Sequence, residues 1–168
     1  MRRATAAIGS ALFFSLAPGV VAGVVPWWLT RWEARDPLPY WPPLRWVGVL
    51  LIVAGAAVVI HAFVRFVVEG AGTPAPVAPT ERLVVGGLYR HVRNPMYLGL
   101  LSAIVGQAVV LGQPVLVTYA AVMLMAFATF VRLYEEPALR RRYGAEYDTY
   151  RRAVPGWWPR LRAWRPLS

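Results

Sequence analysis

The stretch from residue 87 to residue 99, GLYRHVRNPMYLG, separates two apolar runs and determines how the rest of the chain is interpreted. Five consecutive positions within it carry four polar side chains: Arg90, His91, Arg93 and Asn94. An apolar run begins directly after Pro95. Polar groups at the start of a membrane helix are costly unless a function requires them there. We therefore expect this stretch to bind a polar ligand at a membrane surface.

A second polar group, Glu135–Glu136, follows the last apolar run. Neighbouring residues on a helix point about 100° apart, so these carboxylates do not face one another. We expect one of them to accept hydrogen bonds from the ligand and the other to cap a helix or pair with an arginine. The alternative is a solvated charge pair at the end of a membrane helix.

Apolar residues make up 58% of the 168 residues, against roughly 45–50% in ordinary soluble domains. They are concentrated in four runs: residues 6–29, 46–68, 96–111 and 115–133. Runs of this length can cross a bilayer core of about 30 Å, although the third is short. The predicted fold class is an all-α integral membrane protein with about four transmembrane helices. Cysteine is absent, which excludes disulfides and thiolate catalysis, and with only two histidines we expect no metal site.

We expect a single membrane domain over residues 1–168. Residues 1–69 would form two N-terminal spans, residues 70–95 a linker and ligand-binding loop, and residues 96–133 a helical hairpin whose connection is only three residues long. Residues 134–168 would form a tail that covers the ligand. The first run also has features of a cleaved signal peptide, although its apolar character continues to Trp27–Trp28, which suits a membrane interface.

The segment from residue 137 to residue 154 is predicted to be an amphipathic helix. Large apolar and aromatic residues recur there at spacings of three and four: Leu139, Tyr143, Tyr147, Tyr150 and Val154. Gly144 is a point where this helix could break into two pieces. The residues after Pro155 are rich in tryptophan and proline and have no periodicity.

The net charge of +10 comes entirely from arginine. Four spans place both termini and the 70–95 loop on one side, together with thirteen arginines, and leave three on the other. The positive-inside rule then places both termini and the ligand site in the cytosol. The arginines flank apolar runs and form no nucleic-acid-binding motif, so we expect no nucleic-acid partner.

The sequence motifs of several enzyme classes are absent from this chain. There is no nucleophile elbow, no P-loop and no GxGxxG fingerprint after a strand. Asn94–Pro95 suits the start of a helix, since Asn caps well and Pro fits the first turn. Capping alone does not explain the neighbouring Arg90, His91, Arg93 and Tyr97.

Three blocks of sequence resemble the superfamily of isoprenylcysteine carboxyl methyltransferases and phospholipid methyltransferases. They are LVVGGLYRHVRNPMYLG, YEEPAL and RRYGAEYDTYRRAVPGW, and together they span about half of the chain. Enzymes of this superfamily are integral membrane proteins that use S-adenosylmethionine without a Rossmann domain. NPMY with LYEEP is similar to the phosphatidylethanolamine branch, whereas the segment 144–155 is similar to the carboxyl methyltransferase branch, which usually has histidine at the position of Asn94.

The resemblance implies roles for particular residues. A cofactor site for S-adenosylmethionine would be lined by Glu81, Arg82, Leu83, Val84, Tyr89, Asn94, Pro95, Met96, Tyr97 and Glu135. We assign Arg93, Arg132 and Glu135 to catalysis. The carboxyl methyltransferases have a substrate-contacting arginine one turn before the glutamate, where this chain has Val131, with Arg132 next to it.

The function that the resemblance implies is methyl transfer from S-adenosylmethionine to a lipid-like or isoprenoid-like acceptor within the bilayer, at a carboxyl or an amine. Such a reaction mainly requires that donor and acceptor are aligned and that water is excluded. Two alternatives remain open: a membrane reductase that uses NADPH, and a membrane protein that keeps the scaffold without catalysis.

Overall fold

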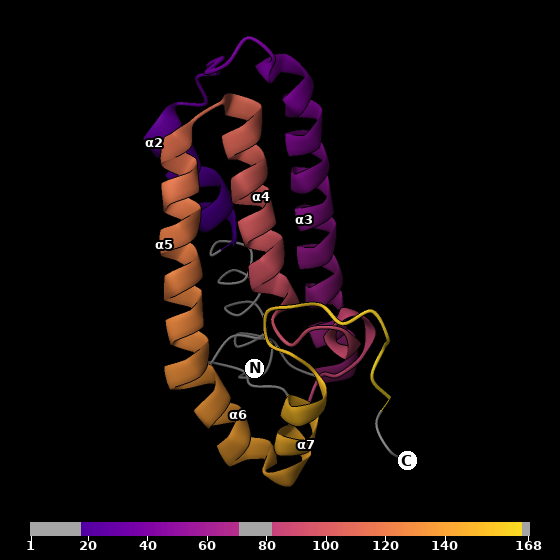
Figure 1. Ribbon diagram of the computed structural model, residues 1–168. Helices are drawn as coiled ribbons and strands as arrows, with labels where there is room; N and C mark the ends of the chain where they lie inside the picture. The colour runs from indigo at the N-terminus through magenta and orange to yellow at the C-terminus, as the bar shows by residue number, and fades with distance from the viewer. Residues whose placement is uncertain (1–17, 71–81, 166–168) are drawn as a thin grey trace, which may run out of the picture.

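The structure is a computed structural model of the chain that describes residues 18–70 and 82–165. Within these two ranges all regular structure is helical, and there is no strand. The longest helices, α3 (Trp41–Gly70), α4 (Pro95–Leu111) and α5 (Pro114–Phe130), stand side by side (Figure 1). The short helices α6 (Glu136–Tyr143) and α7 (Ala145–Ala153) lie beyond one end of this bundle.

Small residues bring α3 and α4 into close contact. A Cβ added to Gly48 would lie 2.6 Å from the carbonyl oxygen of Gly106, and a Cβ on Gly99 would lie 2.8 Å from that of Gly55. Glycines at these crossing points let two membrane helices pack backbone against backbone. The Ser102 hydroxyl donates to the carbonyl oxygen of Leu51 at 2.9 Å across the same interface.

Helix α3 begins five residues before the predicted run at Trp46. The apolar run from residue 46 does not mark the start of the helix, because Pro42 and Pro43 fall in the first turn, where a helix needs no backbone N–H donor. The indole Nε1 of Trp41 donates to the carbonyl oxygen of Val109 at 2.9 Å, which ties the start of α3 to the end of α4.

Helices α4 and α5 form the helical hairpin. Gly112 ends α4 with φ +61°, and Gln113 leads directly into α5. A positive φ is readily adopted only by glycine, and a Cβ here would also collide with the carbonyl oxygen of Arg35. The Gln113 amide donates to the carbonyl oxygen of Glu33 at 2.9 Å, so the 31–36 loop is fixed against the hairpin turn.

A π-helical turn, Val131–Glu135, connects α5 to α6. Pro137 follows this π-turn, in the first turn of α6. Proline has no backbone N–H to donate to the preceding turn, and its ring clashes with a carbonyl group of that turn. Just before this proline the backbone hydrogen bonds take the π-helical spacing of five residues, and the N–H of Glu136 donates to the carbonyl oxygen of Val131. π-turns of this kind often occur at functional sites.

The amphipathic segment 137–154 consists of two helices, because Gly144 adopts φ +52° between α6 and α7. Its apolar stripe forms a buried cluster around Tyr147, Tyr150 and Val154, as the spacing indicates. Leu83 and Val85, from the loop before α4, and Trp164, from the tail, pack against this cluster. The C-terminal region is therefore folded onto the end of the helical bundle.

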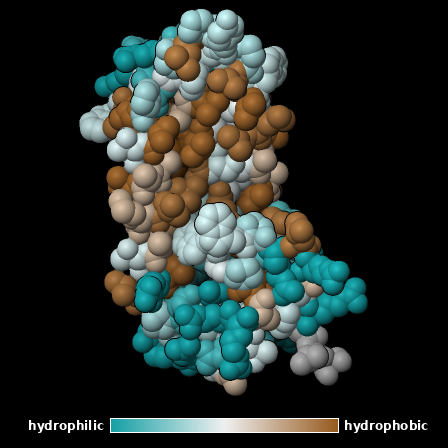
Figure 2. Space-filling view, viewed as in Figure 1, coloured by the Kyte–Doolittle hydropathy of each residue, from teal (hydrophilic) through white to brown (hydrophobic). Residues whose placement is uncertain are grey.

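Two helical stretches among the described residues are long and apolar enough to cross a membrane: Trp41–Arg65 and Pro114–Tyr143. Val20–Thr30 and Pro95–Leu111 are shorter apolar helices. Much of the outer surface of α3 is apolar and exposed, including Leu50, Val53 and Ile60. Figure 2 shows apolar side chains along the bundle and polar ones gathered at its ends, which is the surface of a membrane protein. The count of four spans stays a prediction, and residues 6–17 of the first run lie outside the described residues.

Candidate functional site

The loop that contains residues 87–94 is covered by the C-terminal tail. A short 3-10 helix, η2 (Gly87–Arg90), precedes α4. Four hydrogen bonds then join residues 90–93 to the segment 155–164 of the tail. Arg93 N donates to Pro155 O at 2.9 Å, Arg160 N to His91 O at 2.9 Å, Trp164 N to Arg90 O at 3.0 Å, and His91 Nδ1 to Arg160 O at 2.8 Å. Residues 155–164 thus pack against the polar stretch and cover it.

Arg93 links the loop to both C-terminal helices. Its Nη1 forms a 2.6 Å ion pair with Glu136 and a 3.1 Å hydrogen bond to the hydroxyl of Tyr147. Its Nε donates to the carbonyl oxygen of Val154 at 2.9 Å. The side chains of Arg93 and Glu136 are only 13% and 17% exposed, so little solvent screens the pair. Arg151 also contacts Glu136, at 3.2 Å.

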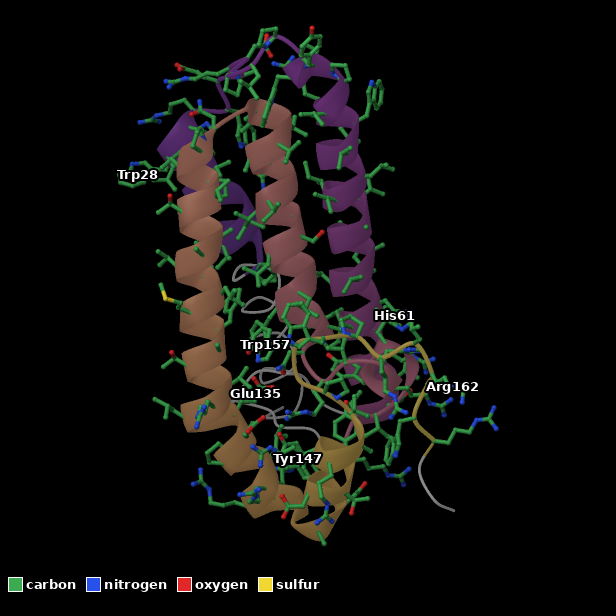
Figure 3. All side chains as sticks on the ribbon, in the orientation of Figure 1. Trp28, His61, Glu135, Tyr147, Trp157 and Arg162 are labelled. Atoms are coloured by element: carbon green, nitrogen blue, oxygen red, sulfur yellow. The ribbon has the colours of Figure 1, made fainter. Side chains whose placement is uncertain are left out.

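Glu135 has a different partner from its neighbour. Its Oε2 accepts a 3.0 Å hydrogen bond from the hydroxyl of Tyr97, at the first turn of α4. The ring of Tyr97 stacks on Phe127 with centroids 4.7 Å apart and lies 6.3 Å from the ring of Trp157. Figure 3 shows Glu135 and Trp157 on the same side of the bundle end. Glu136 is therefore paired with arginine, and Glu135 lies among aromatic side chains; that Glu135 accepts hydrogen bonds from a ligand stays a prediction.

Asn94 occupies the N-cap position of α4, but its side chain makes no capping hydrogen bond. The residue is 7% exposed, and its Nδ2 has no hydrogen-bond partner among the described residues. Its backbone N–H donates to Gly156 O at 3.3 Å, which holds the tail over it. A buried donor without a partner costs about 1–3 kcal/mol, so a capping role does not account for this side chain.

The remaining predicted site residues lie at different depths. Val84, Tyr89, Asn94 and Pro95 are buried, whereas Leu83, Arg93, Met96, Tyr97 and Glu135 are half-buried. Val84 and Tyr89 form a small core with Ala62 of α3, against which Met96 packs. Arg82 is exposed, and Glu81 lies outside the described residues.

Arg132 does not join the group around Glu135. It is exposed on the π-turn, while the neighbouring Val131 is buried. Within the described ranges there is no cluster of three His, Asp or Glu side chains that could hold a metal ion.

Three residues of this site were missed in the sequence: Tyr147, Gly156 and Trp157. Tyr147 was interpreted only as part of the apolar stripe, yet its hydroxyl bonds to Arg93. Gly156 and Trp157 lie in a segment whose sequence has no periodicity, so the sequence could not predict that they pack near Asn94 and Tyr97. A Cβ on Gly156 would lie 3.1 Å from Nη2 of Arg93, which leaves little space for a side chain at this position.

Three tyrosines, Tyr89, Tyr147 and Tyr150, remain neutral at physiological pH because their pKa is raised. Burial is the main cause that raises the pKa of Tyr89, Tyr147 and Tyr150 above its usual value. For Tyr147, the neighbouring Arg93 guanidinium opposes this increase. The neutral hydroxyl of Tyr150 donates to Tyr89 O at 2.7 Å, a further bond between tail and loop.

The fold and the site define a class: an all-helical membrane protein with a buried polar site closed by its own tail at one end of the bundle. A family model described as phospholipid methyltransferase matches residues 44–146, which is more than half of the chain. The chain belongs to this family. The match includes α3, the loop, the hairpin and Glu135, so the predicted resemblance is confirmed.

Plant proteins are similar to part of the chain. A probable protein-S-isoprenylcysteine O-methyltransferase of Oryza sativa subsp. japonica is 35% identical over 74 residues, 44% of this chain and 39% of the relative. Protein-S-isoprenylcysteine O-methyltransferase B of Arabidopsis thaliana is 35% identical over 75 residues, 45% of this chain and 38% of the relative. The matched region thus spans about two fifths of the length of these relatives. No solved structure matches the chain.

Proposed function

We propose that this protein is a membrane methyltransferase that takes a methyl group from S-adenosylmethionine. The observation that carries the proposal is the buried Nδ2 of Asn94, which has no partner in the described chain and lies close to the tail that covers Tyr97. An enclosed donor without a partner is the feature expected of a site that is completed by a ligand.

The residues around Asn94 suit this methyl donor chemically. The donor has hydroxyl and ammonium groups that donate hydrogen bonds, and Glu135 is a carboxylate that can accept them. It also has acceptor atoms for Nδ2 of Asn94, and a positive sulfonium suited to the aromatic rings of Tyr97 and Trp157. The family assignment adds support, since it names methyl transfer as the reaction class.

When bound, S-adenosylmethionine supplies an electrophilic methyl group for an in-line displacement. The protein itself then has to orient the two reactants and exclude water from the site. In our proposal Tyr97, Asn94 and Glu135 bind the donor, and the tail with Trp157 excludes water. Arg93 is then a positioning residue, because its Nε and Nη1 already hold the tail and Glu136.

The acceptor that we propose is lipid-like, with a carboxyl or an amine as the methylated group. The plant relatives are named for isoprenylcysteine, and the family for phospholipids. An acceptor of either kind can reach the end of the bundle from within the bilayer. No role for Arg132 follows from its exposed position.

The reaction can be tested with the protein in lipid nanodiscs. We expect radiolabel from methyl-labelled S-adenosylmethionine to enter the organic phase when a cellular lipid extract is added as the acceptor source. The Glu135→Gln variant should transfer much less label, whereas Glu146→Gln, a change at an exposed carboxylate of α7, should transfer label normally. Equal transfer by the wild type and by Glu135→Gln would contradict the proposed site.

We further propose that the site faces the cytosol, on the basis of the arginine distribution. The chain has no cysteine, so single cysteines can report topology. We expect Leu161→Cys, at a side chain 98% exposed in the tail, to resist an impermeant reagent added outside intact cells. Leu38→Cys, 58% exposed in the loop at the other end of the bundle, should react. The reverse pattern would overturn the orientation.

A further inference from the structure

Two neighbouring cavities lie outside the proposed donor site. The first, about 420 Å³, is lined by the end of α3 and the loop and contains several charged and imidazole side chains: His61, Arg65, Glu69, Arg90 and His91. The second, about 250 Å³, lies between α3 and α4 and is bordered by the tail at Pro159. Leu88 and His91 line both, so the two cavities are adjacent.

The first cavity carries an excess of positive charge. Among the described residues that line it, the one carboxylate is Glu69, and it is already engaged: Arg65 pairs with one of its oxygens at 2.6 Å, and the N–H of Gly86 donates to the other at 2.9 Å. The Arg90 guanidinium and the two imidazoles have no carboxylate partner among the lining residues. An anion would therefore find donors here without facing an uncompensated negative charge.

The loop backbone lies very close to these side chains. Gly87 adopts φ +56°, and a Cβ at this position would collide with Nε2 of His61 and lie 2.8 Å from Nε of Arg65. The tail fixes His91, whose Nδ1 bonds to the carbonyl oxygen of Arg160 at 2.8 Å. Because a carbonyl oxygen only accepts, Nδ1 carries the hydrogen, and Nε2 donates to an anion only when the ring is protonated.

The second cavity is apolar. Its walls include Ala54 and Val58 of α3 and Pro95, Leu98 and Ser102 of α4. The hydroxyl of Ser102 is already bonded to Leu51 O, so it does not make the wall polar. A hydrocarbon chain beside α3, much of whose surface is apolar and exposed, suits these surroundings.

Both cavities lie on the α3 side of α4, whereas the proposed donor site lies on the α5 side. Tyr97 points toward Phe127 of α5 and bonds to Glu135. In Figure 3, His61 and Glu135 lie on opposite sides of the lower end of the bundle. Neither cavity is lined by Tyr97, Glu135 or Asn94; among the described residues that the resemblance places at the cofactor, Pro95 alone borders the second cavity.

We propose that the two cavities form one binding site for an anionic membrane lipid. The phosphate of the headgroup binds among Arg65, Arg90 and the imidazoles, and the start of one chain enters the apolar cavity between α3 and α4. Charge selects the headgroup, and the adjacent apolar space distinguishes a lipid from a free phosphate. The site is separate from methyl transfer and does not depend on that assignment.

Native mass spectrometry of the detergent-solubilised protein, titrated with lipid, tests this site. We expect phosphatidylglycerol to bind more tightly than phosphatidylcholine with the same chains, and inorganic phosphate to compete only weakly. Arg90→Gln should weaken phosphatidylglycerol binding about tenfold, the low end for a charge-assisted hydrogen bond. Arg141→Gln removes the same charge from an exposed position on α6 and should change binding little.

A second pair of variants tests the apolar half. Val58→Trp should fill the cavity and weaken phosphatidylglycerol binding, whereas Val117→Trp adds the same bulk at an exposed position of α5 and should not. Melting temperatures of all four variants establish that they are folded. Equal binding of the two lipids, equal loss in Arg90→Gln and Arg141→Gln, or full competition by phosphate would each overturn the proposal.

Discussion

Replacement of Arg93 by methionine is expected to lower the free energy of unfolding by about 3 kcal/mol. The change leaves Glu136, whose side chain is 17% exposed, without its 2.6 Å partner, and removal of one member of a poorly solvated ion pair costs about 3–5 kcal/mol. We take the low end because Arg151 remains 3.2 Å from the other oxygen of Glu136. The same change removes the bond that holds Val154 O, so the tail should also become more accessible to protease.

The control for this prediction is Arg151→Met. The Arg151 side chain is 42% exposed, and exposed ion pairs contribute about 0–1 kcal/mol. Chemical unfolding of both variants in detergent, with limited proteolysis of the tail, measures the difference. If Arg93→Met and Arg151→Met unfold at the same denaturant concentration, Arg93 does not hold the loop to the tail.

The Glu135→Gln variant is expected to bind S-adenosylmethionine about 10- to 100-fold more weakly. This range corresponds to the roughly 1.5–3 kcal/mol of a hydrogen bond to a charged group. The amide is nearly the same size and still accepts from the hydroxyl of Tyr97, so the fold should be retained.

Two further variants separate a binding role from a structural one. Tyr97→Phe removes only the hydroxyl that bonds to Glu135 and should have a smaller effect on affinity. Glu146→Gln changes an exposed carboxylate and should leave affinity unchanged. Affinity of Glu135→Gln equal to that of Glu146→Gln would remove Glu135 from the donor site.

The long helices and the pairing of Glu136 with an arginine could be predicted because they depend on local pattern. Residues three and four apart share a helix face, so the spacing from Leu139 to Val154 predicted the buried cluster even though Gly144 breaks the helix. The start of α3 was predicted five residues too late. Prolines in the first turn of a helix and prolines in a loop cannot be told apart from composition alone.

The path of the tail could not be predicted from the sequence. Its position depends on long-range bonds, such as that from Arg160 N to His91 O, and on packing of Trp164 against Tyr150. Neither leaves a periodic signal. The environment of the Asn94 side chain could not be predicted either. The residue type and the following proline both indicate a helix cap, but in the structure Nδ2 is buried and the side chain makes no capping hydrogen bond.

Calorimetric titration of the detergent-solubilised protein with S-adenosylmethionine and with NADPH tests the central claim most directly. The wild type should bind S-adenosylmethionine at one site and give no binding heat with NADPH. Asn94→Asp keeps the size of a side chain that makes no capping hydrogen bond, so no cap is lost, but it should bind S-adenosylmethionine distinctly less well, because its new charge repels the carboxylate of the donor. Binding of NADPH instead, or affinity for S-adenosylmethionine unchanged by Asn94→Asp, would contradict the donor site described here.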